Sequence, residues 1–216
     1  MLEPMGAFFA RRLAGYDAHM RRDIVGAAEF YPAAAALLPE LPGCRVLDLG
    51  CGTGLELEEY FPRNPTARVT GIDLSPEMLA ALRGKFPDRA LDLRPGSYLE
   101  LSLGEAEYDA AISVESLHHF SPAVKLGLYR RLRAALKPGG IFVLADYFAA
   151  SPEEEAACFR ELEAQKKQEG VPSDTLVHFD TPLTRDHELA LLRAAGFAAP
   201  TVLGNWGATA LIRAVR

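Results

Sequence analysis

The stretch that determines the fold of this chain reads Arg45-Val46-Leu47-Asp48-Leu49-Gly50-Cys51-Gly52-Thr53-Gly54. A second apolar run, Val69-Thr70-Gly71-Ile72, follows it and ends at Asp73. A strand, a glycine turn, a helix and a second strand ending in a carboxylate are typical of an open parallel sheet that binds a nucleoside. The glycines let a ligand approach the backbone, and the carboxylate can accept both hydroxyls of a ribose. These residues therefore predict a nucleoside site at the carboxyl ends of the strands.

The glycine spacing and the charges around it indicate which nucleoside binds. A dinucleotide fingerprint requires Gly-x-Gly-x-x-Gly, but Leu55 stands where the third glycine would fall. Asp48 precedes the turn and Glu56, Glu58 and Glu59 follow it, with no Lys or Arg to offset them. A pyrophosphate at this helix start would face acidic side chains, whereas a ligand with sulfonium and ammonium groups suits them. The sequence favours S-adenosylmethionine and disfavours an NAD oxidoreductase.

Three motifs, in order and spacing across residues 44–148, resemble class I S-adenosylmethionine-dependent methyltransferases. They are Val46 to Gly54, then Gly71-Ile72-Asp73-Leu74-Ser75-Pro76-Glu77-Met78, then Leu136-Lys137-Pro138-Gly139-Gly140. The resemblance implies an α/β, Rossmann-like, doubly wound seven-stranded sheet, mostly parallel with an antiparallel last strand, plus a helical lid. It also implies in-line methyl transfer from S-adenosylmethionine to a small-molecule acceptor.

The pattern of apolar runs, prolines and glycines predicts the elements. Strands are expected at 45–49, 68–72, 89–93, 108–114 and 141–147, with an antiparallel pair at 199–203 and 208–215. Helices are expected at 54–61, 76–86, 122–137, 152–169 and 185–195. Residues 4–38 predict two helices broken near Gly15. We expect residues 1–40 to form an N-terminal helical lid and residues 41–216 the methyltransferase domain, with 151–183 as an insert in the substrate cover.

Within the resemblance, Asp73 is the expected ribose ligand, and Leu74 and Met78 are expected to flank the adenine. Tyr16 resembles a tyrosine that many family members fold over the cofactor, and Ser97 stands where the family often has an aspartate that accepts from the adenine amino group. Cys51 is expected to pack inside the turn, and Asp48 to lie near the methionine ammonium. The full predicted cofactor set is Tyr16, Asp48, Gly50, Cys51, Gly52, Gly54, Asp73, Leu74, Met78, Ser97, Tyr98, Val114 and Glu115.

Residues that could perform the chemistry follow strands 108–114 and 141–147, because open sheets bind ligands at the strand carboxyl ends. His118, His119 and Tyr147 are the predicted catalytic residues. Oxygen or nitrogen acceptors often need a base, whereas activated carbons and thiolates need little, so the use of a base stays open. We expect at most one of the two histidines to face the methyl group. His178 is expected to be an exposed loop residue, and no metal centre is predicted.

Composition limits the classes of function. A chain of 216 residues with 49% hydrophobic content suits one α/β domain, and a net charge of −6 disfavours broad contact with nucleic acid. No Asn-Pro-Pro-Tyr motif follows strand 108–114, which disfavours DNA base methylation. The three cysteines show no metal spacing, and neither a signal peptide nor a transmembrane run is visible. We expect a cytoplasmic monomer or homodimer without a membrane partner.

Two alternatives stay open. The charged helix after residue 151, the irregular insert and the closing strand pair distantly resemble carboxy-S-adenosylmethionine synthase, which takes part in wobble-uridine modification of tRNA. That family holds the extra carboxylate with an arginine of the insert, yet residues 170–182 contain no arginine. The other alternative is a non-catalytic S-adenosylmethionine-binding module that acts through a partner.

Overall fold

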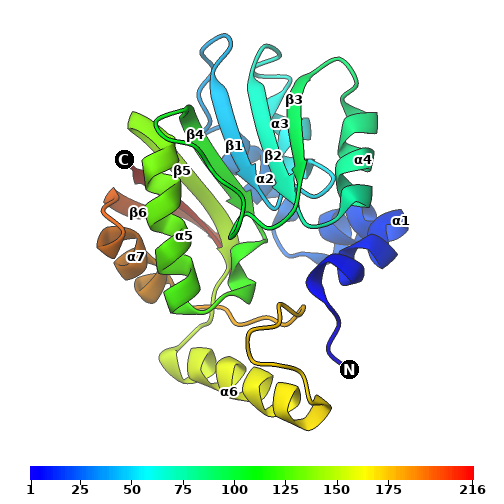
Figure 1. The fold of residues 1–216 in the computed structure, drawn as a ribbon. Coiled ribbons are helices and arrows are strands. Elements are labelled where there is room, and N and C mark those ends of the chain that lie inside the picture. Colours follow the sequence, from blue (N-terminus) through cyan, green and yellow to red (C-terminus); the bar gives the residue numbers. More distant parts are fainter.

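The computed structural model describes residues 1–216, and its centre is a single seven-stranded sheet (Figure 1). In chain order the strands are β1 (Arg45–Leu49), β2 (Arg68–Asp73), β3 (Ala90–Pro95), β4 (Tyr108–Val114), β5 (Leu136–Tyr147), β6 (Ala198–Trp206) and β7 (Thr209–Val215). Across the sheet they lie in the order β3-β2-β1-β4-β5-β7-β6. The order reverses between β1 and β4. Such a reversal creates a crevice at the strand carboxyl ends, where open sheets bind ligands.

Strand pairing confirms the predicted sheet. β1 pairs in parallel with β2 and β4, and the outer strands β3 and β5 continue this direction. β7 runs antiparallel to both β5 and β6. The fold is therefore the Rossmann-like, doubly wound sheet with an antiparallel last strand that the sequence predicted.

Helices cover both faces of the sheet (Figure 1). They are α1 (Met5–Asp23), α2 (Ala27–Ala35), α3 (Leu55–Tyr60), α4 (Pro76–Lys85), α5 (Pro122–Ala135), α6 (Pro152–Glu169) and α7 (Arg185–Ala194), with a short 3₁₀ turn η1 (Leu117–His119). The buried side chains form two clusters, one with α2 and α3 and one with α5 and α7. In β1, Val46 joins the first cluster and Leu47 the second, because successive strand residues point to opposite faces. None of the helices is long and apolar enough to cross a membrane.

Several helices begin at the residues that the sequence indicated. The hydroxyls of Ser75 and Ser121 accept hydrogen bonds from amides of the first turns of α4 and α5, and a proline follows each serine. Thr184 caps α7 in the same way, and Gly196 lies just beyond its end with a φ of +93°. Each side-chain cap satisfies a backbone amide that the helix leaves unpaired, which contributes about 1 kcal/mol to stability.

The N-terminal helix differs from the prediction. The sequence predicted a break near Gly15, but α1 runs through this residue to Asp23. Gly15 is exposed and nothing lies near its Cβ position, so it costs the helix only about 1 kcal/mol relative to alanine. The break comes at Gly26, where φ is +81° and a Cβ atom would collide with the side chain of Trp206. Glycine is therefore required at position 26, between the two helices, both by its backbone conformation and by the packing of Trp206.

Strand β5 also begins earlier than predicted, at Leu136 instead of Ile141. The segment Pro138-Gly139-Gly140, expected as a turn before the strand, lies inside it. Gly139 has a φ of +77°, and the register between β4 and β5 shifts between Tyr108 and Ala110. The glycines thus form an irregularity within the strand.

The N-terminus and the segment after α6 contact each other. Pro4 and Val177 form an isolated β-bridge, and the backbone N–H of His178 donates a hydrogen bond to the carbonyl of Glu3 at 2.9 Å. Figure 1 shows α6 below the sheet, on the same side as the start of α1. In contrast, α2 packs into the core, with Phe30 fully buried. The division into a lid of residues 1–40 and a domain of residues 41–216 stays a prediction.

Candidate functional site

Two cavities lie at the carboxyl ends of the central strands. The narrow cavity has a volume of about 50 Å³ and the large cavity about 760 Å³. Four side chains line both of them, namely Phe9, Tyr16, Glu115 and His119. The narrow cavity lies between the glycine turn after β1, the end of β2 and the N-terminal half of α1. Its other lining residues are Met5, Gly50, Gly52, Asp73, Leu74, Met78, Tyr98, Ser116 and Phe120.

The glycine turn is held by Asp73 and by the residues that follow β4. The two carboxylate oxygens of Asp73 accept hydrogen bonds from the backbone N–H groups of Gly52 at 2.9 Å and Ser75 at 2.8 Å. Gly50 has a φ of +73°, and a Cβ atom there would collide with the side chain of Ser116. Only glycine fits this position. Asp73 therefore organises both the turn and the start of α4, and its ribose contact stays a prediction.

Two buried carboxylates flank the glycine turn in the chain. Asp48 on β1 and Glu56 on α3 are 1% and 5% exposed, respectively. Oδ2 of Asp48 and Oε1 of Glu56 are the buried side-chain atoms of this chain that lack a hydrogen-bond partner. Burial raises the pKa of Asp48 well above its ordinary value and that of Glu56 to about 7. A cationic group would satisfy both oxygens, so the residues fit a ligand with an ammonium group, such as S-adenosylmethionine.

The predicted cofactor residues divide into two groups. Eight line the narrow cavity, namely Tyr16, Gly50, Gly52, Asp73, Leu74, Met78, Tyr98 and Glu115. The other five, Asp48, Cys51, Gly54, Ser97 and Val114, do not line it. Cys51 and Val114 belong to the apolar core, and the Ser97 hydroxyl accepts a hydrogen bond from the N–H of Leu99 at 3.2 Å. Their binding roles stay predictions.

The large cavity lies beneath one face of α1. Its remaining walls come from η1, from Tyr147 at the end of β5, from the segment after α6, and from the turn between β6 and β7. Four of the five histidines of the chain line it, namely His19, His118, His119 and His178. Its volume of about 760 Å³ lies within the range of about 300–1,000 Å³ that is typical of small-molecule sites.

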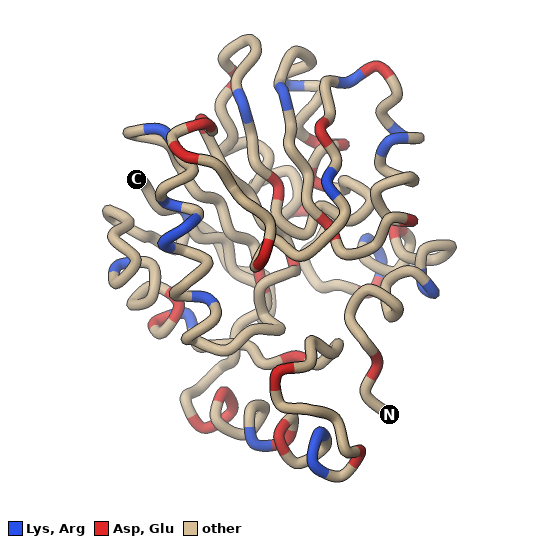
Figure 2. The backbone as a smooth tube through the Cα atoms, in the orientation of Figure 1, with Lys and Arg blue, Asp and Glu red and all other residues tan.

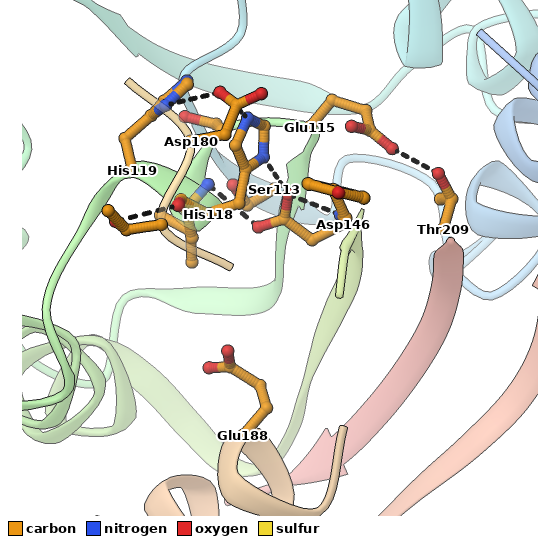
Figure 3. Close-up of polar contacts among 12 residues, drawn as sticks. Ser113, Glu115, His118, His119, Asp146, Asp180, Glu188 and Thr209 are labelled. Carbon is orange, nitrogen blue, oxygen red and sulfur yellow. Dashed lines mark hydrogen bonds and ion pairs between the residues drawn. The ribbon is translucent and has the colours of Figure 1, made fainter. Parts of the chain in front are cut away.

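His118 lies between two carboxylates (Figure 3). Its Nδ1 is 2.6 Å from Oδ1 of Asp146, and its Nε2 is 3.5 Å from Oδ1 of Asp180. Burial opposes a charge on His118, but Asp146 and then Asp180 outweigh it and raise the pKa of His118 to about 10. Both ring nitrogens face acceptors, so His118 is an imidazolium ion at neutral pH.

His119 has the opposite character. Its Nδ1 is 3.2 Å from the backbone carbonyl of Phe179, which can only accept, so Nδ1 carries the proton. Burial and the charge of His118 lower the pKa of His119 well below its ordinary value. Nε2 of the neutral ring therefore holds a free electron pair. Both histidines line the large cavity, and the expectation that at most one of them faces the methyl group stays a prediction.

Glu115 is the first residue after β4, and its φ of +49° is unusual for a residue other than glycine. Its Oε1 accepts a hydrogen bond from the hydroxyl of Thr209 at 2.9 Å (Figure 3). Burial and then the charge of Asp146 raise the pKa of Glu115 to about 7. The strained backbone places this carboxylate where the two cavities meet, and such strain is common at functional sites.

The predicted catalytic set of His118, His119 and Tyr147 lacks Asp146 and Asp180. Asp146 directly precedes Tyr147 at the end of β5, and this position is the signal that could have identified it. Asp180 comes from the irregular segment after α6, where no sequence pattern indicates its neighbours. The prediction for His178 was wrong. It is half-buried, and its ring stacks on Phe8 with centroids 3.4 Å apart.

His118, His119 and Asp180 also bring three nitrogen or oxygen atoms within 4.8 Å of one another. Contacts of Oδ1 of Asp180 with both imidazoles, at 3.5 and 3.4 Å, account for this cluster. The contact with His118 lowers the pKa of Asp180 to about 2, so its carboxylate is charged. We interpret the cluster as an ion-pair network, and the absence of a metal centre stays a prediction.

Comparison with known proteins adds independent evidence. Residues 46–140 match the family model described as a methyltransferase domain. The ubiquinone biosynthesis O-methyltransferase of Xanthomonas campestris pv. campestris is 39% identical over 108 residues, which are 49% of this chain and 44% of that protein. The tRNA (carboxymethyluridine(34)-5-O)-methyltransferase of Arabidopsis thaliana is 33% identical over 126 residues, which are 57% of this chain and 29% of that protein. The chain spans about half the length, or less, of these curated relatives.

A solved structure agrees over nearly the whole chain. The S-adenosylmethionine dependent methyltransferase from Mesorhizobium loti is similar with a TM-score of 0.64 and 25% sequence identity. The similarity covers 86% of this chain and 96% of that one. The similarity therefore extends well beyond the segment that the family model matches.

Proposed function

We propose a function from one premise: the chain belongs to the class I S-adenosylmethionine-dependent methyltransferases, as its motifs predicted. We infer that it transfers a methyl group to a small-molecule acceptor by in-line displacement. The observation that carries this proposal is the pair of cavities with a shared wall. A cofactor in the narrow cavity, which has to widen to admit it, and an acceptor in the large one would meet at Tyr16, Glu115 and His119. S-adenosylmethionine, when bound, supplies a methyl group on a sulfonium ion.

The residues of the narrow cavity suit the cofactor role. Asp73 keeps free lone pairs beside its two backbone contacts, and these can accept ribose hydroxyls. Leu74 and Met78 provide apolar surface for an adenine. Asp48 and Glu56 provide unpaired oxygens for an ammonium group. Tyr16 lies over Gly52, which supports its role as a cover.

A small molecule is the acceptor that the large cavity and the charges favour. Figure 2 shows Lys and Arg interspersed with Asp and Glu along the backbone. With a net charge of −6, broad displacement of counterions from a nucleic acid is disfavoured. A cavity of about 760 Å³ instead suits a compact ligand.

We propose that His119 is the general base that takes the acceptor proton. It lines both cavities, its Nδ1–H is held by the Phe179 carbonyl, and its Nε2 is free. A positioned base of this kind contributes about 10²–10⁴-fold to a rate. The acceptor atom that this arrangement serves is a hydroxyl or an amine nitrogen. Carbon nucleophiles and thiolates need little help from a base.

His118 and Tyr147 have supporting roles in this proposal. The charge of the His118 imidazolium is compensated by Asp146 and Asp180, and in this proposal His118 holds the Asp180 carboxylate beside His119 at the wall of the large cavity. The Tyr147 ring lies edge-on to His118 with centroids 6.0 Å apart and forms part of the same wall. Burial is the main cause that raises the pKa of Tyr147, so its hydroxyl stays protonated and can donate to the acceptor.

The carboxy-S-adenosylmethionine synthase alternative needs an arginine for the extra carboxylate. Arg11 and Arg12 of α1 line the large cavity, but both form ion pairs with Glu3. Residues 170–182 supply none. The arginine positions therefore favour methyl transfer over this alternative.

Mass spectrometry tests the proposal in two steps. The nucleoside released from the purified protein identifies the cofactor, and a carboxylated form would support the alternative instead. The protein is then incubated with trideuteromethyl-labelled cofactor and separate sets of phenols, aliphatic alcohols and amines. We expect label in one set, and none with the His119→Gln variant at equal cofactor occupancy. Cofactor binding without label in any set would favour the non-catalytic module.

A further inference from the structure

We propose that Glu56 and Asp48 form a carboxylate pair that shares one proton and exchanges it for the ammonium group of the cofactor. This inference rests on the proposed use of S-adenosylmethionine. It adds Glu56 to the binding site and assigns a proton release to cofactor binding.

The two carboxylates face each other across the glycine turn. In β1 the side chain of Asp48 points to the same face as Val46, the face that α3 covers. Glu56 is the second residue of α3. Each side chain keeps one buried oxygen without a hydrogen-bond partner. A buried polar atom without a partner is costly, so these two oxygens require either a shared proton or a cationic group of a ligand.

The side chains around the pair provide no free cation for these two oxygens. The titratable groups around the pair are Asp73 of β2, Glu58 of α3, Lys85 of α4, Tyr16 of α1, Tyr31 of α2 and Cys51 of the turn. Lys85 is the one cation among them, and its Nζ already pairs with Asp17 at 2.5 Å and Glu58 at 2.7 Å. The neighbourhood of the pair is therefore acidic, and two adjacent carboxylates in such surroundings cannot both ionise. One proton stays between them.

Neither carboxylate lines the narrow cavity, but residues close to both of them do. Tyr16 lines this cavity, and after burial the charge of Glu56 is the largest influence that raises the pKa of the Tyr16 hydroxyl. Gly52, which also lines the cavity, belongs to the turn between Asp48 and Glu56. An amino-acid group in the cavity would therefore lie next to the pair.

The exchange balances without any covalent step. Before binding, one carboxyl group is neutral and shares its proton with the other, which is ionised. After binding, both are ionised, the ammonium N–H groups donate to their free oxygens, and one proton passes to solvent. Burial and then the charge of Glu56 raise the pKa of Asp48 well above its ordinary value, so the pair keeps one proton even above the pKa of about 7 of Glu56, and this proton competes with the cofactor. Affinity should therefore rise with pH, most steeply below about pH 7, where Glu56 also takes up a proton.

Isothermal titration calorimetry measures this exchange directly. S-adenosylhomocysteine is the probe, because it has the same amino-acid end and transfers no methyl group. Titrations at about pH 6 and about pH 8.5, in buffers of different ionisation enthalpy, give the number of protons released at each pH. We expect release of about one proton at the higher pH and of more than one at the lower, where Glu56 is also protonated. Methylthioadenosine, which lacks the ammonium group, should release none at either pH.

Two matched variants separate Glu56 from general charge effects. Glu56→Gln should abolish proton release and the pH dependence of affinity, and thermal melts report whether it folds. Glu58→Gln makes the same change on the same helix at a side chain that pairs with Arg21 and Lys85, and it should keep the release. If Glu56→Gln does not fold, Asp48→Asn provides the equivalent test.

The outcomes distinguish this inference from the proposed function. If the wild-type protein binds S-adenosylhomocysteine without releasing a proton, or if the folded Glu56→Gln variant releases as many protons as wild type, the carboxylate exchange is wrong. If neither S-adenosylmethionine nor S-adenosylhomocysteine binds at any pH, the proposed function fails first.

Discussion

Nδ1 of His118 and Oδ1 of Asp146 lie 2.6 Å apart, and both side chains are almost completely buried. The second oxygen of Asp146 accepts a hydrogen bond from the N–H of Leu117 at 2.9 Å. The end of β5 thereby holds η1 at both its first and its second residue. Because His119 is the third residue of this turn, the contact between His118 and Asp146 also fixes the orientation of the proposed base.

Replacing Asp146 with asparagine should destabilise the protein strongly. The change leaves the buried His118 with only the longer contact to Asp180, and removal of one member of a buried ion pair costs about 3–5 kcal/mol. Urea unfolding at neutral pH measures the loss. The double variant His118→Gln/Asp146→Asn should recover part of it, since it leaves no uncompensated charge. A loss below about 1 kcal/mol for the single variant would contradict the buried ion pair.

Replacing His119 with glutamine should lower kcat by about 10²–10⁴-fold and leave the affinity for the cofactor unchanged. Glutamine keeps a similar size but cannot take a proton. Steady-state kinetics with an identified acceptor, together with calorimetry of cofactor binding, give the two values. An equal loss in the Tyr147→Phe variant with none in His119→Gln would move the base to Tyr147.

The pH profile separates His119 from Glu115 as the base. Burial and His118 lower the pKa of His119, so its neutral form is present throughout the range from about pH 6.5 upward. With saturating cofactor, kcat/KM for the acceptor should therefore be flat from about pH 6.5 to 8 and fall only in more acid solution. A rate that rises through about pH 7 would instead identify Glu115, whose pKa is about 7.

Replacing Asp73 with alanine should weaken cofactor binding by about 1.5–3 kcal/mol, because charge-assisted hydrogen bonds to the ribose disappear. It should also lower the melting temperature, since the N–H groups of Gly52 and Ser75 lose their acceptors. Asp73→Asn is the control that keeps one side-chain acceptor oxygen. Unchanged cofactor affinity in Asp73→Ala would remove the central residue of the predicted nucleoside site.

Lys125 and Glu188 form a second buried ion pair, 2.5 Å from Nζ to Oε2, that joins α5 to α7. The Tyr129 hydroxyl also donates to Glu188, which Figure 3 shows set apart from the site. Lys125→Met should cost about 3–5 kcal/mol because it leaves Glu188 charged in the core. The double variant Lys125→Met/Glu188→Leu should regain most of this stability in urea unfolding. Full additivity of the two losses would show that the pair does not interact.

The parts of the fold that the sequence predicted correctly are those that local patterns specify. The glycine turn, the strand ends and the caps at Ser75, Ser121 and Thr184 each depend on residues within a few positions of one another. The predicted break in the N-terminal helices was placed at the wrong glycine, because Gly15 lies inside α1, whereas Gly26 has the left-handed backbone and packs against the distant Trp206. No local pattern includes such a contact.

The candidate site, like the fold, could be predicted only in part. The histidines were identified from their position after β4, yet their different protonation states could not be predicted. His119 owes its free Nε2 to a carbonyl 60 residues further along the chain. His118 owes its charge to Asp146 on a neighbouring strand and to Asp180 in an irregular segment. The sequence therefore identified these residues, but their protonation states depend on tertiary contacts that it did not reveal.

The position of Trp206 has a practical consequence. It is the single tryptophan of the chain, and it lines the large cavity but not the narrow one. All indole fluorescence of the molecule thus originates at the proposed acceptor wall. A change in emission intensity or wavelength on addition of a compound would report occupancy of that wall directly. Screening for acceptors can therefore begin as an optical titration, with unlabelled protein and no turnover.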